Sequence, residues 1–483
     1  MTALDFDPVT AHPRAAGWSQ DGRPSGAAGQ TDREEGRRRR MQRIARICRR
    51  LSRRSGLAGL LALVMLVAGW WSSGWAGEPP IALKAKRVFT AVTGEVLEDA
   101  VVLVDDHGKI AAIGRVVPKG SVLVDLGDAT LLPGFIDAHV HLSGEMSDNW
   151  YRDFYHRMLR PPAEQAHYAA RNARKTLLAG FTTVRDVGSA DWQAVSLRNA
   201  IRAGVIEGPR ILAANYSIGS TGGHADGPPF RPEQIAPDGP VKGVCNGPDE
   251  CRAAVRFQIK YGADVIKFMP SGGVLSLTDP VDVPELTQEE MNAIVSEAHA
   301  WDRKVAAHCH GDKAARMAIA AGVDSIEHGT FLSDETLRLM KRKGVYLVPT
   351  LFAGEWVGQQ ADRYPPAVAE KARAAAAQMQ KMFQRAVKIG VPIAFGTDAG
   401  VEPHGLNAHE FSLMVKNGMS PRQALLAATR EGAKLLGLAD RIGTLEPGKI
   451  ADVIAVAGDP LTDIKATEKV IFVMKAGRII KRP

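Results

Sequence analysis

The main part of this chain has almost no excess charge of either sign. Of the formal net charge of +8 over 483 residues, residues 1–76 carry +7, because they hold 13 Arg and no Lys against 6 acidic residues. Residues 77–483 therefore carry a net charge of only about +1. Such a balance gives no electrostatic reason to bind nucleic acid, so we exclude a nucleic-acid partner.

The apolar run Gly56–Trp71 is too short to span a bilayer comfortably. It follows a cluster of arginines between Arg43 and Arg54 and precedes Gly74-Trp75-Ala76, which puts small residues where a signal peptidase cleaves. This order of segments is typical of a secretory signal peptide.

We therefore interpret residues 41–76 as a signal peptide, with translation starting at Met41, and residues 1–40 as a disordered, Arg-rich segment. The expected location is the periplasm or the extracellular space. Contact with a membrane is expected only through the signal segment, and an uncleaved membrane anchor is the alternative interpretation.

Cysteine is scarce, with four residues in the whole chain. Cys245 and Cys251 flank the turn sequence Asn246-Gly247-Pro248, and in an exported protein they form either a disulfide that closes this loop or two free thiols. Cys309 lies between two histidines, and we interpret it as a small buried apolar residue and not as a nucleophile.

The two ends of the mature chain are rich in short β-strands, and the middle alternates apolar runs with amphipathic helices. Eight strand-helix units predict the α/β class, with a (β/α)₈ TIM-like barrel over residues 133–441. The strands of residues 77–132 and 442–483 predict one small β-sandwich domain built from both ends. The stretch 287–301 is a helix that we expect Thr287 and Glu290 to cap.

Polar side chains recur where the predicted barrel strands end, which is where such barrels hold their active sites. His139 and His141 are two apart at the end of the first strand, so both imidazoles point to one face. Lys267 stands among apolar residues on the fourth strand. Burial disfavours its ammonium form, and a neutral amine can react with CO₂ to give an anionic carbamate.

Three further strand ends carry ligand types: His308 on the fifth strand, His328 on the sixth and Asp398 on the eighth. Each residue alone has an ordinary structural explanation, but the six together suit two divalent metal ions with the Lys267 carbamate as a bridge. Zinc is the metal that we expect, and manganese and cobalt stay open. Asp398 would also move the proton from the attacking water to the leaving nitrogen.

The run Leu132-Pro133-Gly134-Phe135-Ile136-Asp137-Ala138-His139-Val140-His141 resembles the opening motif of the amidohydrolase superfamily, and residues 443–452 resemble its return into the small β-domain. The resemblance covers nearly everything from Ile81 to the C-terminus. Within the superfamily, the chain resembles the imidazolonepropionase-like, prolidase-like branch of Xaa-Pro or Xaa-Arg/Lys dipeptidases, which includes ochratoxin-hydrolysing enzymes. The resemblance implies a binuclear site with a carboxylated lysine.

Two more histidines are expected to contact the substrate. His224 lies on the Gly-rich loop after the third strand, and in relatives a histidine of this loop reaches the reaction centre, where it would donate to the developing oxyanion. Ala225 stands where members commonly have glycine. His310 is two residues after His308, so on a continuing strand it would share that face.

The sequence therefore predicts an exported hydrolase that cleaves amide bonds of dipeptides or N-acyl amino acids, with ochratoxin A among the substrates to be tested. The alternatives are a cyclic-amide hydrolase, an imidazolonepropionase-like enzyme, and a non-catalytic scaffold on the same fold. The expected partners are a small-molecule substrate and further copies of the same chain in a homo-oligomer.

Overall fold

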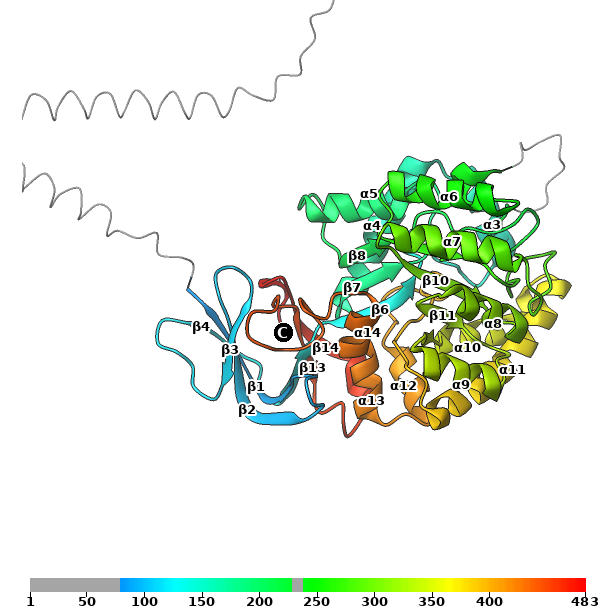
Figure 1. Cartoon of the computed structure of the whole chain (residues 1–483). Coiled ribbons are helices and arrows are strands. Elements are labelled where there is room, and N and C mark those ends of the chain that lie inside the picture. The colour runs from blue at the N-terminus through cyan, green and yellow to red at the C-terminus, as the bar shows by residue number, and fades with distance from the viewer. Residues whose placement is uncertain (1–78, 228–237) are drawn as a thin grey trace, which may run out of the picture. The chain divides into compact units, whose positions relative to one another are not determined.

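The computed structural model describes residues 79–227 and 238–483, apart from the side chain of Arg157 (Figure 1). The predicted disordered segment and signal peptide lie outside the described residues. Within these ranges, no helix is both long and apolar enough to cross a membrane.

Strands from both ends of the described chain form one mixed, eight-stranded sheet, in the order β15-β14-β13-β5-β1-β2-β3, with β4 beside β1. The two ends meet where β13 pairs antiparallel with β5, Ile454 opposite Leu132. The strands are β1 (Ile81–Phe89), β2 (Val96–Val104), β3 (Ile110–Gly114), β4 (Val122–Asp125), β5 (Ala129–Pro133), β13 (Val453–Ala457), β14 (Val470–Lys475) and β15 (Arg478–Lys481).

This sheet confirms that strands from both chain ends pack together. The predicted sandwich differs in one respect: the strands join edge to edge in one hydrogen-bonded sheet, because β5 pairs with β1 on one side and with β13 on the other. Side chains from both ends, such as Leu83, Val102 and Phe472, share one buried apolar cluster.

The middle of the chain holds two parallel sheets. One has the order β6-β7-β8, with β6 (Phe135–Val140), β7 (Phe181–Asp186) and β8 (Arg210–Ala213). The other has the order β12-β11-β10-β9, with β9 (Val265–Phe268), β10 (Lys304–Cys309), β11 (Ser325–His328) and β12 (Tyr346–Val348). Isolated parallel bridges connect their edges, at Ile218–Phe268, Leu347–Ile393 and Val140–Ala399.

The predicted eighth strand, residues 392–397, forms no regular strand and makes only a single bridge at Ile393. The physical reason is that side chains replace part of the ladder: the Thr397 amide donates to Asp137 Oδ1 at 3.1 Å, and its hydroxyl donates to Oδ2 at 2.7 Å. The segment still runs beside β6, since the Ala138 amide donates to the Phe395 carbonyl.

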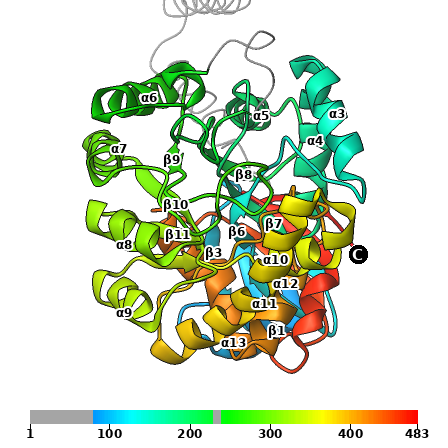
Figure 2. The same cartoon turned by 90° about the vertical axis from the view of Figure 1, so that its right-hand side faces the viewer.

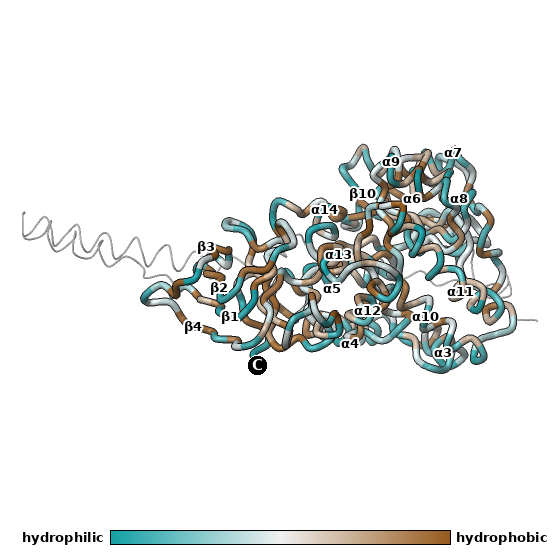
Figure 3. The backbone as a smooth tube through the Cα atoms, turned by 90° about the horizontal axis from the view of Figure 1, so that it is seen from below, coloured by the Kyte–Doolittle hydropathy of each residue, from teal (hydrophilic) through white to brown (hydrophobic). Residues whose placement is uncertain are grey.

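Helices lie outside the strands, and Figure 2 shows α6 to α9 along the outer side of β9, β10 and β11. The chain in Figure 3 alternates between hydrophobic and hydrophilic residues along these outer helices, as expected of helices with one buried face. The helices are α3 (Trp150–Leu159), α4 (Pro162–Leu178), α5 (Gln193–Arg202), α6 (Pro248–Lys260), α7 (Gln288–Ala300), α8 (Asp312–Ala321), α9 (Asp334–Lys343), α10 (Leu351–Gln359), α11 (Pro366–Ile389), α12 (His409–Lys416), α13 (Pro421–Leu426) and α14 (Gly432–Leu435).

Two local predictions are settled by the structure. The capping box of α7 is present, because the Thr287 side chain accepts from the Glu290 amide and the Glu290 side chain accepts from the Thr287 amide. Of the two interpretations of Cys245 and Cys251, the structure has the disulfide. Cys309 is fully buried, and burial raises the pKa of its thiol well above the usual value, as expected for a small apolar side chain.

Candidate metal centre and active site

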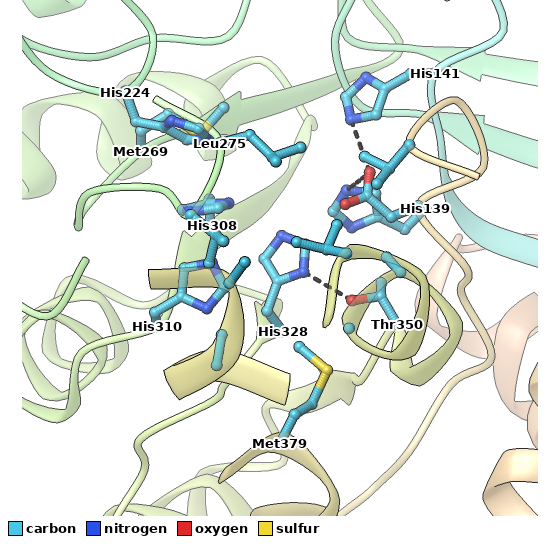
Figure 4. A pocket seen from close by; sticks show the side chains of 18 of the residues that line it. His139, His141, His224, Met269, Leu275, His308, His310, His328, Thr350 and Met379 are labelled. Atoms are coloured by element: carbon cyan, nitrogen blue, oxygen red, sulfur yellow. Dashed lines mark hydrogen bonds and ion pairs between the residues drawn. The ribbon is translucent and has the colours of Figure 1, made fainter. Parts of the chain in front are cut away.

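One pocket, with about 750 Å³ of space including its open mouth, lies among the ends of the parallel strands (Figure 4). All eight residues that the sequence singles out for the site line this pocket: His139, His141, His224, Lys267, His308, His310, His328 and Asp398. Five of the predicted strand ends therefore deliver their polar side chains to the same place.

The first potential metal-binding group contains His139, His141 and Asp398. Asp398 Oδ1 is buried without a hydrogen-bond partner, and it lies 3.4 Å from His139 Nε2 and 3.2 Å from His141 Nε2. Burial alone would raise the pKa of Asp398, but the two imidazoles hold it well below its usual value. The carboxylate is therefore ionised.

Hydrogen bonds set the tautomers of the two imidazoles. His141 Nδ1 lies 2.8 Å from the Gly188 carbonyl, which can only accept, so Nδ1 carries the proton. His139 Nδ1 lies 2.8 Å from Glu327 Oε2 and donates in the same way. In the neutral rings, both Nε2 lone pairs then face the anionic oxygen of Asp398. Either a proton or a metal ion must lie between these atoms, and against the opposing effect of burial Asp398 accordingly raises the pKa of His141. A bound metal ion would take the place of the proton, so these residues fit a metal ion.

The second group contains His308, His310 and His328, all buried. His328 Nδ1 lies 2.7 Å from the Thr350 hydroxyl, and His310 Nδ1 lies 2.7 Å from the Thr330 hydroxyl. Burial lowers the pKa of all three rings, that of His310 to about 3, so they are neutral and able to bind a cation. The sequence reasoning assigned His310 to the substrate, whereas the structure also places it within ligand distance of His308 and His328.

Lys267 lies on β9 and is only 1% exposed. Burial lowers the pKa of its ammonium to about 8, against the opposing pull of the Glu327 and Asp398 carboxylates. The neutral amine of Lys267 is therefore far more accessible near neutral pH than that of an exposed lysine. This is the state in which the amine can react with CO₂.

Glu327 is a buried residue of the site that the sequence reasoning missed. Besides His139, it accepts from Arg185 Nη2 at 2.8 Å and from the Ser325 hydroxyl. Burial would raise its pKa, but Arg185 and His139 lower it to about 2. Arg185, which is also fully buried, holds Glu327 ionised through this ion pair.

His224 approaches the second group from the loop after β8, and its ring centre lies 4.4 Å from that of His308. Its amide donates to Glu285 Oε2 at 2.9 Å, and its Nδ1 lies 3.1 Å from the Ser276 hydroxyl. Burial lowers the pKa of the His224 ring to about 4, so it is neutral. The substitution of Ala225 for the common glycine is accommodated, and Ala225 packs beside Gly219.

Three non-glycine residues of the site have backbone in the left-handed region: His328 at φ +68°, Thr350 at φ +50° and Asp398 at φ +73°. Each turns the chain sharply where a strand-like segment ends, and each thereby aims its side chain into the pocket. Such a conformation is uncommon for residues with a Cβ, and clusters of it are typical of functional sites. Thr350, for which the sequence showed no role, orients His328.

Comparisons with known proteins show the family of this chain. The model of the amidohydrolase family matches residues 130–480. An ochratoxinase of Aspergillus niger is 34% identical over 377 residues, which cover 73% of this chain and 76% of that protein.

Two solved structures have the same fold. A Xaa-Pro dipeptidase with bound methionine in the active site superposes with a TM-score of 0.79 at 40% identity, covering 83% of this chain and 100% of the other. A prolidase complexed with N-methylphosphonate-L-proline superposes with a TM-score of 0.76 at 29% identity, covering 84% and 100%. The chain belongs to the amidohydrolase family. It is a metal-dependent amidohydrolase related to the ochratoxinase and the prolidases.

Proposed function

We propose that this enzyme uses two divalent metal ions to hydrolyse the amide bond of dipeptides, of the Xaa-Pro or Xaa-Arg/Lys type, or of N-acyl amino acids, with ochratoxin A as one candidate. The observation that carries the proposal is the meeting of two ligand groups and a buried, partly neutral lysine in one pocket. Neutral imidazoles and carboxylates suit Zn²⁺, which we propose as the native metal.

The fold supports this reading. We infer that the isolated parallel bridges close the two parallel sheets into the predicted (β/α)₈ barrel, with residues 392–399 in the place of the eighth strand. In this proposal, the barrel comprises residues 133–441, and the β-domain comprises residues 77–132 and 442–483. Strand ends of such a barrel converge on one rim, which accounts for the common position of the ligands.

His139, His141 and Asp398 would hold one metal ion, and His308 and His328 the other, with a Lys267 carbamate between them. His310 is close enough to the second group to serve it as well. When bound, the two ions supply Lewis-acid polarisation of the scissile carbonyl and a water that ionises near neutral pH. The carbamate would form when the neutral Lys267 Nζ attacks CO₂: the N–C bond forms, one C=O π bond breaks with its electron pair moving onto oxygen, and one amine proton passes to water.

The other chemical steps fall to side chains of this chain. The ionised Asp398 carboxylate takes a proton from the attacking water and delivers it to the leaving nitrogen. His224 Nε2 can donate to the developing oxyanion if it carries the ring proton. In that tautomer, His224 Nδ1 accepts a hydrogen bond from the Ser276 hydroxyl, which lies 3.1 Å away. This hydroxyl has two further acceptors, the Gly273 carbonyl and the Asp279 carboxylate. They also accept from Lys371 Nζ and from the Gly273 amide, respectively.

The relatives support the choice of substrate. One is named an ochratoxinase, one is a Xaa-Pro dipeptidase with methionine in its active site, and one is a prolidase in complex with N-methylphosphonate-L-proline. The ligands of the two solved structures, methionine and N-methylphosphonate-L-proline, each contain an amino acid. Hydrolysis of a cyclic amide and imidazolonepropionase-like chemistry remain the competing proposals on the same site.

We further propose that the enzyme is exported to the periplasm or secreted. The Arg-rich stretch, the apolar run and the small residues before position 77 support this, and so does the Cys245–Cys251 disulfide, since disulfides persist in oxidising compartments. N-terminal sequencing of exported protein would test it. The predicted homo-oligomer stays a prediction, for which light scattering is the test.

The experiment that tests the function combines metal analysis with a substrate screen. Protein reconstituted with zinc and bicarbonate is expected to hold about two metal ions per chain and to hydrolyse members of a panel of Xaa-Pro, Xaa-Arg/Lys, N-acyl amino acid and ochratoxin A substrates. Chelation should abolish turnover, and zinc should restore it. Metal-free protein after reconstitution, or hydrolysis confined to cyclic amides, would overturn the proposal.

A further inference from the structure

The pocket has a second, apolar wall, formed by the helices α10 and α11. Ala353 and Val357 are four residues apart on α10, so they lie on one face of that helix, and both line the pocket. Ala372, Ala375 and Met379 follow one another at spacings of three and four on α11 and line it as well. Alanine at three of these places leaves room that larger residues would fill.

This wall is held at a fixed distance from the histidines. The α10 helix packs on α11 so closely that a Cβ added at Gly358 would lie 2.6 Å from the Cβ of Ala376. At its start, the Leu351 and Phe352 amides donate to the buried Glu410 carboxylate at 2.9 and 2.7 Å. Thr350, the residue before α10, hydrogen-bonds to His328. The start of the apolar wall is therefore attached directly to one of the histidines of the second group.

A loop extends the apolar wall. Val274 and Leu275 line the pocket, and Figure 4 shows Leu275 and Met379 on different sides of the histidine cluster. Lys371, on the same helix as Met379, fixes this loop, because its Nζ donates to the carbonyls of Gly273 at 2.7 Å, Ser276 at 2.8 Å and Asp279 at 3.0 Å. The ammonium group of Lys371 is therefore bound to the carbonyls of this loop, and Lys371 is not among the residues that line the pocket.

Charge is confined to the other side of the pocket. Of the described residues that line it, only the histidines, Lys267 and Asp398 have ionisable side chains, and all of them belong to the reaction centre. A guanidinium or ammonium group placed against the apolar wall would find no counter-ion there, and the burial of an unpaired charge is costly. An aliphatic or aromatic side chain would instead gain from burial.

We propose that the face of α10 and α11, with Val274 and Leu275, is a specificity subsite that takes a bulky uncharged apolar side chain adjoining the scissile amide. The inference rests on the proposed amide hydrolysis and narrows it: substrates with leucine, methionine or phenylalanine side chains are selected, and those with arginine or lysine side chains are rejected. Ala375 and Met379 set the size of the subsite.

The test uses the full-length zinc-loaded enzyme with two matched series, Xaa-Pro dipeptides and N-acetyl amino acids, in which the varied residue is Gly, Ala, Leu, Met, Phe, Lys or Arg. In the series that is hydrolysed, kcat/KM for Leu, Met or Phe is expected to exceed that for Lys or Arg at least about tenfold. Binding of free L-methionine, L-phenylalanine and L-arginine, measured by calorimetry, gives a readout that does not depend on turnover.

Two variants change the subsite in opposite directions. Ala375→Leu should fill it and lower kcat/KM for the large apolar residues about tenfold relative to Gly. Met379→Ala should enlarge it and shift the preference from Leu towards Phe. Ala374→Leu is the control, since Ala374 is the neighbouring exposed alanine of α11 and should leave the profile unchanged. Metal content is measured for each variant to show that the reaction centre is intact.

The outcomes separate the two proposals. If no substrate of either series is hydrolysed but methionine and phenylalanine bind and arginine does not, the subsite stands and the proposed reaction fails. If amides are hydrolysed with equal efficiency for Leu and Arg, or if Ala375→Leu and Met379→Ala keep the parent profile, the reaction stands and the subsite is wrong.

Discussion

Replacement of Glu327 with glutamine provides a quantitative test of how the site is built. Glu327 is fully buried and accepts from Arg185, His139 and Ser325. Its pKa is lowered from 4.5 to about 2, and a lowering of this size corresponds to about 3 kcal/mol of stability at neutral pH. Breaking a buried ion pair costs about 3–5 kcal/mol in other proteins, which agrees.

The pH dependence follows from the direction of this shift. Because the folded-state pKa is the lower one, the contribution is fully present above the unfolded pKa of about 4.5 and is lost as the pH falls towards about 2. Urea unfolding of the metal-stripped parent and of Glu327→Gln should therefore differ by about 3 kcal/mol at pH 7, and the difference should shrink below pH 4.5.

The same substitution should weaken metal binding. Without the carboxylate, the tautomer of His139 is no longer fixed, and loss of such an orienting partner typically lowers metal affinity 10–100-fold. The control is Glu297→Gln, which removes an ion pair with the exposed Arg256 on the surface and should have much less effect on unfolding and none on metal affinity. If Glu327→Gln unfolded within 1 kcal/mol of the parent and bound zinc equally well, the assigned role of Glu327 would be refuted.

Three other substitutions test the reaction centre. Lys267→Ala should lose metal and activity together, and reactivation of the stripped parent by bicarbonate should speed up as the pH rises through about 8; full metal occupancy in the variant, measured by mass spectrometry, would contradict the bridging role. Asp398→Asn should lower kcat at least about a hundredfold, and near-normal turnover would remove it as proton carrier. His224→Asn should lower kcat with little change in metal content, and an unchanged kcat would leave this loop residue without a catalytic role.

The parts of the site that follow local rules were predictable from the sequence. The spacing of two between His139 and His141 puts them on one face of a strand, and Lys267, His308 and His328 each stand on one of the apolar runs that became β9, β10 and β11. The capping box of α7 is equally local.

Long-range partners were not predictable from one sequence. Glu327 forms an ion pair with Arg185, 142 residues away in the sequence, and the Thr397 hydroxyl donates a hydrogen bond to Asp137, 260 residues away. Neither contact can be predicted from a local sequence pattern. At the same place, the Thr397 amide donates to the Asp137 carboxylate and not to the backbone of a neighbouring strand. The sequence of α11 predicts a helix with one apolar face. It does not predict that part of this face lines a pocket, because a face that covers the core has the same sequence pattern.

The left-handed backbone at His328, Thr350 and Asp398 has a consequence for how the enzyme matures. Each such residue costs about 1–3 kcal/mol, so the rim of the pocket opposes folding, and the cations that it is built to bind can offset this cost. Cells grown without added zinc should therefore yield less folded protein, and a chelator should lower its melting temperature. Thr350→Gly would remove the backbone strain at this turn, so more protein should fold when zinc is scarce. It would also remove the hydroxyl that orients His328, so the affinity for the metal should fall.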